Sequence, residues 1–267
     1  MARSAVRMDE LTWAEYHRKV EAGAPVILVC AATEQHGPHL PLGTDVMQAR
    51  EIAERAAETV GAVVAPPLPY GYKSQPMSGG GQSFPGTTSL DGETLILLVR
   101  DILSEFIRHG VRRVAVMDAH YENTWFLIEG IDLALRRTQS THTKILHVPF
   151  TALISDATVQ ACFPEGFPGW ATEHAAVLET SMMAVARPEL VRWELIASAQ
   201  GGQAQRIPPY NIYPPPPDIV APSGSLAPPA GGSREKGELL IEEAVRSLVE
   251  ILADEFGLRI RGSDAGQ

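Results

Sequence analysis

The sequence predicts an α/β fold, a three-layer α/β/α sandwich with a mainly parallel central sheet. Short apolar runs of strand length alternate with helical patterns in the order β-α-β-α-β-α-β, which is typical of a parallel sheet covered by helices on both faces. The chain has 267 residues, of which 45% are hydrophobic and 20% charged, an ordinary globular composition. Because no internal repeat or clean boundary interrupts this pattern, we expect a single domain over residues 1–267.

The first 90 residues supply two helices and two strands. Thr12 and Glu15 have the spacing of a capping box, which predicts a helix that runs to about Glu21. The elements expected next are a strand at 26–31, a helix over 46–56 that ends at Gly61, and a strand at 62–65. The Gly- and Pro-rich segment 68–90 is predicted to be irregular, and both a flexible surface loop and a substrate-binding loop fit its composition.

The rest of the chain continues the alternation and then becomes helical. Its expected elements are a helix over 94–109 that stops at Gly110, a strand at 113–117, a helix over 124–137, a strand at 144–148, a helix over 173–186 and a final helix from Ser233. Residues 163–170 form an irregular loop. Residues 207–232 are rich in Pro and Gly, so we expect either an ordered arm within the domain or a linker.

Charge and cysteine content exclude several classes of protein. The net charge is −10 and no basic cluster is present, which argues against nucleic acid and anionic membranes as partners. The sequence has neither an apolar stretch near 18 residues nor a signal-peptide pattern, so we expect a cytoplasmic protein. Cys30 and Cys162 are the only cysteines, too few for a disulfide framework or a Cys-rich zinc site.

Potential metal ligands follow two of the predicted strands. Residues 34–45 come directly after the first strand and include Glu34, His36 and Asp45, while His120 and Glu122 follow the strand at 113–117. In an extended chain residues i and i+2 point the same way, so each Glu/His pair would face one side. Adjacent parallel strands would bring the pairs together. With Asp45 as a bridge, this set suits two divalent cations such as zinc or manganese.

Each of these residues also has an ordinary structural interpretation. Asp45 fits a helix N-cap with Gln48 three residues later, and His36 or His120 alone would more often be a hydrogen-bonded structural histidine. The glutamates could be solvated loop residues. Two mirrored His/Glu pairs at strand ends are harder to explain by coincidence, and they favour the metal site.

Longer motifs carry a family resemblance. The matching stretches are 34–45 (EQHGPHLPLGTD), 70–75, 78–81, 84–90, 119–123 (AHYEN), 129–135, 164–167, 173–174, 178–181 and 233–239. With these motifs the chain resembles the creatininase family (creatinine amidohydrolases) over nearly its whole length. The resemblance implies a single creatininase-like amidohydrolase domain that acts on a small cyclic amide, with creatinine to creatine, reversibly, as the expected reaction.

The resemblance also assigns metal and catalytic roles. It implies zinc and/or manganese as cofactors, one cation held by Glu34, Asp45 and His120 and the other by His36, Asp45 and Glu122. His174 is the implied general acid, and Glu179 orients the site, so that His174, Glu122 and Glu179 are the expected catalytic residues. A homohexamer is implied as well. Alternatives are hydrolysis of a related lactam, a hydantoin-like ring or a formamide, and a metal-binding homologue without turnover.

The substrate side of the site departs from the family pattern. Ser78, Tyr121 and Trp170 match substrate-contacting positions, although Tyr121 would face away from His120 and Glu122 in an extended chain. Trp170 could cover a flat ring or anchor its own loop. Phe150 stands where the family has a tryptophan, and Ala171 where it has an aspartate. These two residues put the exact substrate in question and leave the metal ligands unchanged.

Overall fold

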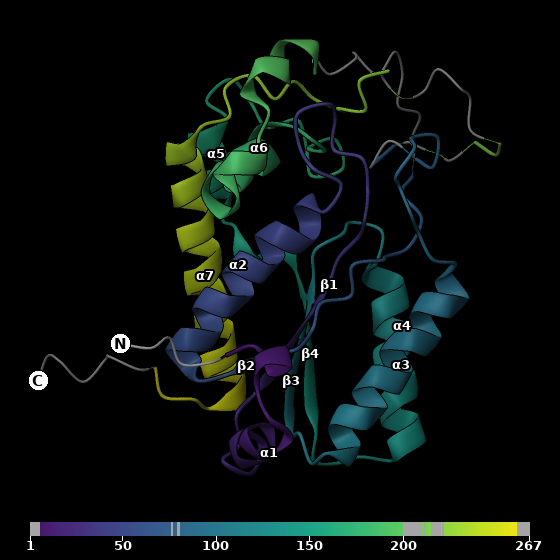
Figure 1. The fold of residues 1–267 in the computed structure, drawn as a ribbon, viewed down its shortest axis with the longest axis vertical. Helices are drawn as coiled ribbons and strands as arrows, with labels where there is room; N and C mark the ends of the chain where they lie inside the picture. Colours follow the sequence, from purple (N-terminus) through teal and green to yellow (C-terminus); the bar gives the residue numbers. More distant parts are fainter. Residues whose placement is uncertain are drawn as a thin grey trace, which may run out of the picture.

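The structure is a computed structural model that describes residues 6–75, 77–78, 81–199, 210, 212–214, 220 and 222–260. Its elements in chain order are η1 (Met8–Glu10), α1 (Trp13–Glu21), β1 (Val26–Cys30), α2 (Thr44–Val60), β2 (Val63–Val64), α3 (Gly92–Arg108), β3 (Arg113–Asp118), α4 (Thr124–Thr138), β4 (Lys144–Pro149), η2 (Phe150–Leu153), α5 (Asp156–Cys162), α6 (Val177–Ala186), η3 (Pro188–Leu190), η4 (Trp193–Ser198) and α7 (Arg234–Phe256), as Figure 1 shows.

The described strands form one parallel sheet in the order β2-β1-β3-β4. Cys30 at the end of β1 pairs with Asp118 in β3, and Asp118 in turn pairs with Pro149 at the end of β4. The carboxyl ends of these three strands therefore lie level with one another. Everything that follows β1, β3 and β4 emerges at the same edge of the sheet, as expected for a parallel α/β arrangement.

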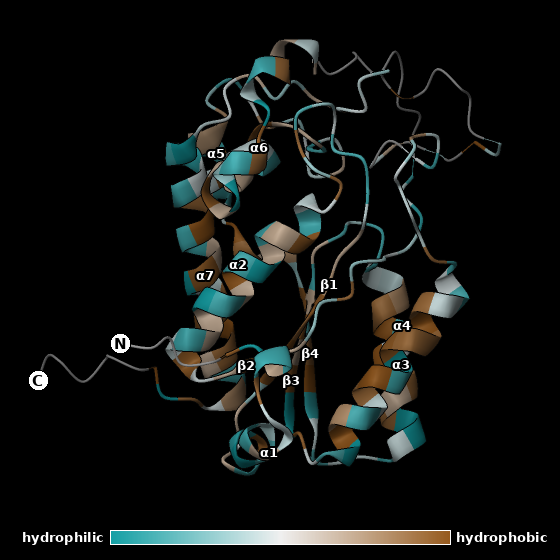
Figure 2. Cartoon of the chain, in the orientation of Figure 1, coloured by the Kyte–Doolittle hydropathy of each residue, from teal (hydrophilic) through white to brown (hydrophobic). Residues whose placement is uncertain are grey.

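Alternate side chains of each strand pack into separate cores on the two faces. In β1, Ile27 and Val29 belong to the core shared with α2, α5, α6 and α7. Val26 and Leu28 belong to the core shared with α3 and α4. Figure 1 shows the same division, with α2, α5, α6 and α7 on one side of the strands and α3 and α4 on the other, and Figure 2 shows hydrophobic residues along the central strands and on the helices beside them. The predicted three-layer α/β/α sandwich is confirmed.

Local signals explain most boundaries and one omission. The Thr12–Glu15 capping box is present, with the Glu15 amide donating to Thr12 Oγ1 and the Thr12 amide donating to Glu15 Oε2. The strand predicted at 62–65 is shorter, because β2 contains only Val63–Val64 before two prolines that cannot donate to a ladder. Helix α5 has no counterpart among the expected elements, because its seven residues are too few for a helical period to be visible.

The predicted arm at 207–232 lies partly outside the described residues. Its described C-terminal part, residues 222–232, returns to the core, where the Leu226 amide donates to the His174 carbonyl. This part of the segment is thus an ordered contact within the fold. Among the helices that the structure describes, none is long and apolar enough to cross a membrane.

Candidate metal centre

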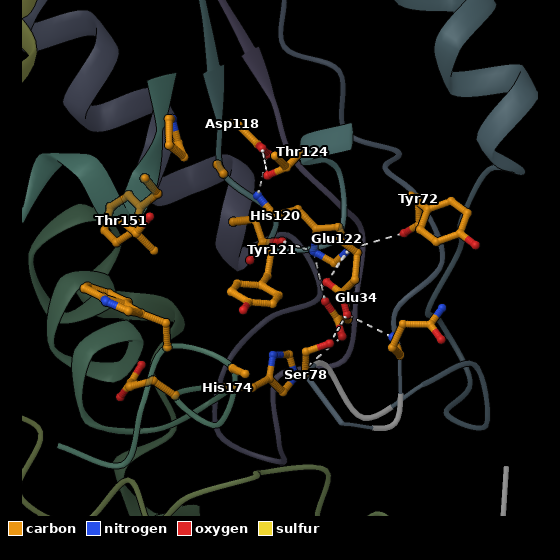
Figure 3. Close-up of a pocket in the computed structure, with 18 of the residues that line it drawn as sticks. Glu34, Tyr72, Ser78, Asp118, His120, Tyr121, Glu122, Thr124, Thr151 and His174 are labelled. Atoms are coloured by element: carbon orange, nitrogen blue, oxygen red, sulfur yellow. Dashed lines mark hydrogen bonds and ion pairs between the residues drawn. The ribbon is translucent and has the colours of Figure 1, made fainter. Parts of the chain in front are cut away.

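The side chains predicted to bind metal converge at the carboxyl edge of the sheet. Glu34 and His36 follow β1, His120 follows β3, and Asp45 lies in the first turn of α2. All four side chains are buried, with at most 6% of their surface exposed. Figure 3 shows Glu34, His120 and Glu122 together, with His174 and Ser78 close by.

Three overlapping groups of acid and histidine ligands occur among the described residues. They are Glu34 with Asp45 and His120, His36 with Asp45 and Glu179, and Glu34 with His36 and His174. In the first group, His120 Nδ1 lies 3.3 Å from Glu34 Oε2 and 3.3 Å from Asp45 Oδ2. In the second, His36 Nε2 lies 3.0 Å from Asp45 Oδ1 and 3.5 Å from Glu179 Oε1. Asp45 thus turns one oxygen to each of the first two groups.

Buried polar atoms in this centre lack hydrogen-bond partners. His36 Nε2, Asp45 Oδ2 and Glu122 Oε2 are inaccessible to water and make no directed hydrogen bond within the described structure. Buried polar atoms are nearly always paired, so these exceptions need an explanation. Imidazole and carboxylate donors that converge without bonding one another fit a divalent cation, and this mixture of donors suits zinc or manganese.

The charges of the centre are strongly coupled. Burial raises the pKa of Glu34 to about 8, against the attraction of His120. Burial opposes ionisation of Asp45, yet His36 and His120 hold the pKa of Asp45 below its usual value. Burial alone would lower the pKa of His120, but Glu122 and Asp45 raise it to about 10. Protons on the imidazoles and a divalent cation therefore compete for the same carboxylates.

The glycine-rich loop after β2 supports this centre. Ser74 Oγ donates to Glu34 Oε1, and the Gly81 amide donates back to Ser74 Oγ. Ser78 Oγ and the Gln75 amide donate to Glu122 Oε1 at 2.6 and 2.9 Å. The loop therefore orients two site carboxylates, whereas its predicted contact with substrate stays a prediction.

Glu122 lies beside His120 and outside the three groups. Its Oε2 is 3.2 Å from His120 Nε2, the ring nitrogen opposite the one that faces Glu34 and Asp45. Glu179 occupies the position next to His36 and Asp45 that the resemblance gave to Glu122. The role of Glu122 as a ligand stays a prediction, and its observed contacts are those of a carboxylate that orients a ligand histidine.

One alternative interpretation of Asp45 and one expectation about His120 and Glu122 are wrong. Asp45 is not a helix N-cap, because α2 begins at Thr44 with Gly43 as its cap, and Gln48 donates to the Glu179 carbonyl at 2.9 Å instead of closing a capping box. The segment 120–123 is a turn, closed by the Asn123 amide donating to the His120 carbonyl at 3.0 Å. The chain therefore bends as soon as β3 ends, and the predicted extended geometry of His120 and Glu122 does not hold.

The helix expected over 173–186 begins later, at Val177. Ala175 has a φ of 53°, a left-handed conformation that a helix cannot continue through. Two carboxylates accept hydrogen bonds from the backbone amides around this break. Glu173 accepts from the Leu178 amide at 2.7 Å, and Glu179 accepts from the Ala175 amide at 2.6 Å. His174 thus lies in the turn before α6, buried beside His36, with their ring centroids 4.4 Å apart. Burial and the charge of His36 lower the pKa of His174 to about 4.

A cavity of about 780 Å³ opens beside the centre. All five residues expected to contact substrate line it, namely Ser78, Tyr121, Phe150, Trp170 and Ala171. The turn at 120–123 brings Tyr121 to the cavity, with 57% of its surface exposed. Trp170 packs edge-on against Phe150, with ring centroids 6.5 Å apart, and also contacts the core, so it both anchors its loop and faces the cavity.

Sequence reasoning missed three residues that shape the site. Gln35 contacts His174, Ser74 contacts Glu34, and Asp118 accepts a hydrogen bond from Thr124 Oγ1 at 2.8 Å and lies 3.0 Å from His147 Nε2. Asp118 had a visible signal, a carboxylate at the end of an apolar strand. Gln35 and Ser74 had none, since their roles depend on segments that are distant in sequence.

An α/β sandwich that gathers carboxylates, imidazoles and a further buried histidine at one edge of its sheet has the arrangement of a metal-dependent hydrolase. The family model described as Creatininase (creatinine amidohydrolase) matches residues 9–252. The chain belongs to the creatininase family.

Individual relatives are similar over nearly the whole chain. Creatinine amidohydrolase from Pseudomonas putida is 42% identical, with 94% of this chain and 98% of the relative covered. A creatininase variant complexed with creatine is 41% identical, with a TM-score of 0.90 and coverage of 95% and 99%. A creatininase structure described as a manganese form is 42% identical with a TM-score of 0.89, and one described as Zn-Zn type is 41% identical with a TM-score of 0.90; each covers 95% of this chain and 99% of the solved chain.

Proposed function

We propose that this protein is a binuclear-metal-dependent amidohydrolase that opens the C–N amide bond of a small cyclic amide, with creatinine and water giving creatine, reversibly, as its reaction. The observation that carries the proposal is the carboxylate–imidazole centre with Asp45 shared between two ligand groups, placed on the wall of a cavity beside His174. The creatinine amidohydrolase from Pseudomonas putida supports the choice of substrate, since 94% of this chain aligns with it.

The ligands proposed for the two cations follow the geometry of the groups. Glu34, Asp45 and His120 would hold one, and His36 and Asp45 the other, with Glu179 as its third ligand in place of the predicted Glu122. Glu122 would then act through His120, against which it lies. The manganese and Zn-Zn forms of similar creatininases support zinc or manganese as the cations. When bound, such a pair supplies an activated water at neutral pH and stabilises the oxyanion that develops on the carbonyl oxygen.

His174 would carry the proton that the reaction moves. Water adds its oxygen to the amide carbon and gives up a proton, and the ring nitrogen departs only after it has gained one. The lowered pKa leaves the His174 imidazole neutral at pH 7, so it can accept the first proton. The same imidazole then donates that proton to the ring nitrogen as the C–N bond breaks. Atoms and charge balance without another reactant.

The cavity would hold the ring of the substrate. Trp170 and Phe150 offer apolar, flat surfaces, and Ser78 and Tyr121 offer hydroxyl groups at its polar side. Ala171 brings no carboxylate to this wall, so a substrate amino group would lack a charged partner there. We keep a related lactam, a hydantoin-like ring and a formamide as the alternative substrates for this reason.

A substrate panel tests the proposal directly. The protein, loaded with manganese or zinc, is assayed against creatinine, creatine, small lactams, hydantoins and formamides. Creatinine and creatine should interconvert faster than any other member reacts. Hydrolysis of formamides without creatinine turnover would overturn the substrate, and stoichiometric metal binding without any turnover would favour a non-catalytic homologue. The proposal extends to a cytoplasmic homohexamer, which sedimentation analysis of the purified protein and fractionation of the source cells would test.

A further inference from the structure

Gln35 lies between two proposed ligands in the sequence, and its own side chain contacts other residues. It follows Glu34 and precedes His36, and its side chain is buried. The Gly37 amide donates to Gln35 Oε1 at 2.9 Å, and Gln35 Nε2 donates to the Gly224 carbonyl at 3.0 Å. Because an amide can only donate and a carbonyl can only accept, these two contacts fix which end of the carboxamide faces which neighbour.

The fixed carboxamide nitrogen also faces His174. Gln35 Nε2 lies 3.0 Å from His174 Nε2. The main-chain carbonyl oxygen of Gln35 lies 2.7 Å from the same ring nitrogen. If His174 Nε2 is protonated, it donates to the main-chain carbonyl of Gln35. If it is unprotonated, it accepts from the Gln35 carboxamide. Gln35 therefore offers a partner to this nitrogen in either tautomer. No hydrogen bond of His174 Nδ1 is found within the described residues, so Nδ1 is the nitrogen left for proton transfer.

A short segment before α7 holds the contact between Gln35 and His174 in place. We call residues 224–226 the clamp segment. Gly224 has a φ of +81°, and a Cβ added there would overlap Gln35 Oε1, so only glycine fits against the carboxamide. Two residues on, the Leu226 amide donates to the His174 carbonyl at 3.1 Å. The clamp segment thus contacts both the side chain of Gln35 and the main chain of His174.

We propose that Gln35, held by the clamp segment, is the positioning residue that orients the His174 imidazole for proton transfer. The inference rests on the proposed role of His174. It adds a contact with Gly224, which is 189 residues from Gln35 in the sequence. His174 precedes α6, which begins only after the left-handed Ala175, so its position depends on contacts from outside that helix, among them those with Gln35 and Leu226.

Two variants break the contact from opposite sides. Gln35→Met keeps the length of the side chain and removes the hydrogen bonds of its carboxamide, whereas Gly224→Ala leaves Gln35 in place and displaces its carboxamide by direct overlap. Each should lower kcat by about 10- to 100-fold with KM and bound metal unchanged, since small misplacements of a reacting group have effects of this size. Gly231→Ala is the control, because Gly231 also has a left-handed φ of +98°, but a Cβ at this position would have only Lys236 Nζ within 4 Å.

A double-mutant cycle separates positioning from a structural role. In a His174→Asn background, Gln35→Met should have no further effect on kcat, because the group through which it acts is gone. Nitrogen-15 NMR of the zinc-loaded protein gives a readout independent of turnover, because Gln35 lies against His174 Nε2. The pattern of His174 ring-nitrogen shifts should be the same in the parent and in Gly231→Ala, and changed in Gln35→Met and Gly224→Ala. The inference would be overturned by an unchanged NMR pattern, by additive effects in the double-mutant cycle, or by loss of bound metal in Gln35→Met. If the parent protein turned over no member of the substrate panel, the proposed function would be overturned instead.

Discussion

Replacing Asp45 by asparagine tests the shared carboxylate at the middle of the centre. Asp45 Oδ1 lies 3.0 Å from His36 Nε2 and Oδ2 lies 3.3 Å from His120 Nδ1, so one side chain serves two ligand groups. Asparagine has nearly the same shape but presents an NH₂ to one group and a neutral oxygen to the other. Both cations should therefore lose affinity from a single substitution, which a carboxylate serving only one site could not cause.

The size of the loss follows from the number of ligands affected. Each three-ligand group is reduced to two intact ligands, with a donor NH₂ now facing one of them. Removing even an outer partner of a ligand weakens metal binding by about 10- to 100-fold, so we expect at least about 100-fold at each site, roughly 2.7 kcal/mol. At free zinc or manganese concentrations that saturate the parent protein, bound metal should fall from two ions to below one.

Metal analysis after gel filtration in a buffered metal solution measures this stoichiometry. Glu51→Gln is the matched control, because Glu51 is a carboxylate on the same helix, α2, that belongs to none of the ligand groups. The control should retain two ions and the thermal stability of the parent. Two ions bound to Asp45→Asn under the same conditions would refute the shared role of Asp45.

Three other predictions concern the second cation, the substrate and the protons. Glu179→Gln should lose one bound ion while Glu122→Gln retains both, and the reverse result in metal analysis would restore Glu122 as the ligand. Ala171→Asp should raise kcat/KM for creatinine by roughly 10- to 100-fold, the effect of a charge-assisted hydrogen bond of about 1.5–3 kcal/mol, and an equal gain in Ala171→Asn would exclude charge as the cause. The raised pKa of His120, about 10, keeps this histidine protonated at pH 7, so a cation must displace that proton to bind. Apparent metal affinity should therefore fall about tenfold for each unit by which the pH is lowered, for each proton released. Calorimetry in buffers of different ionisation enthalpy that finds no proton release would contradict this.

The predicted ligands came from features that are local in the sequence. Glu34 and His36 directly follow an apolar strand, as His120 does, and parallel pairing then requires these segments to meet. The strand register makes this necessary once the fold class is known. The backbone at the strand ends was harder to predict, because the turn at 120–123 depends on Asp118 and Thr124 and not on a period of apolar residues.

The start of α6 shows why a helical pattern can mislead. Residues 173–186 read as one helix, but Glu173 and Glu179 place their carboxylates on backbone amides and so stabilise a break at Ala175. Carboxylates that accept backbone amides near a helix start are ordinary caps, and sequence alone does not tell which turn they cap. The error matters for function, since it moves His174 from a regular helix into a turn whose position is set from outside.

The contacts that position His174 have long sequence separations, and this limits what any local pattern can reveal. Gln35 and His174 are 139 residues apart, and Gln35 and Gly224 are 189 apart. Gly224 lies in a segment that composition marked only as rich in Pro and Gly, yet its missing side chain is what admits the carboxamide. The binding of the cations depends on ligands that follow adjacent strands and are therefore brought together by the sheet. Proton transfer depends on the segments of Gln35, His174 and Gly224, which meet only in the folded chain. Substitutions in the clamp segment should therefore alter turnover while the metal centre stays intact, a separation that metal analysis and kcat measured on the same Gly224→Ala sample would reveal.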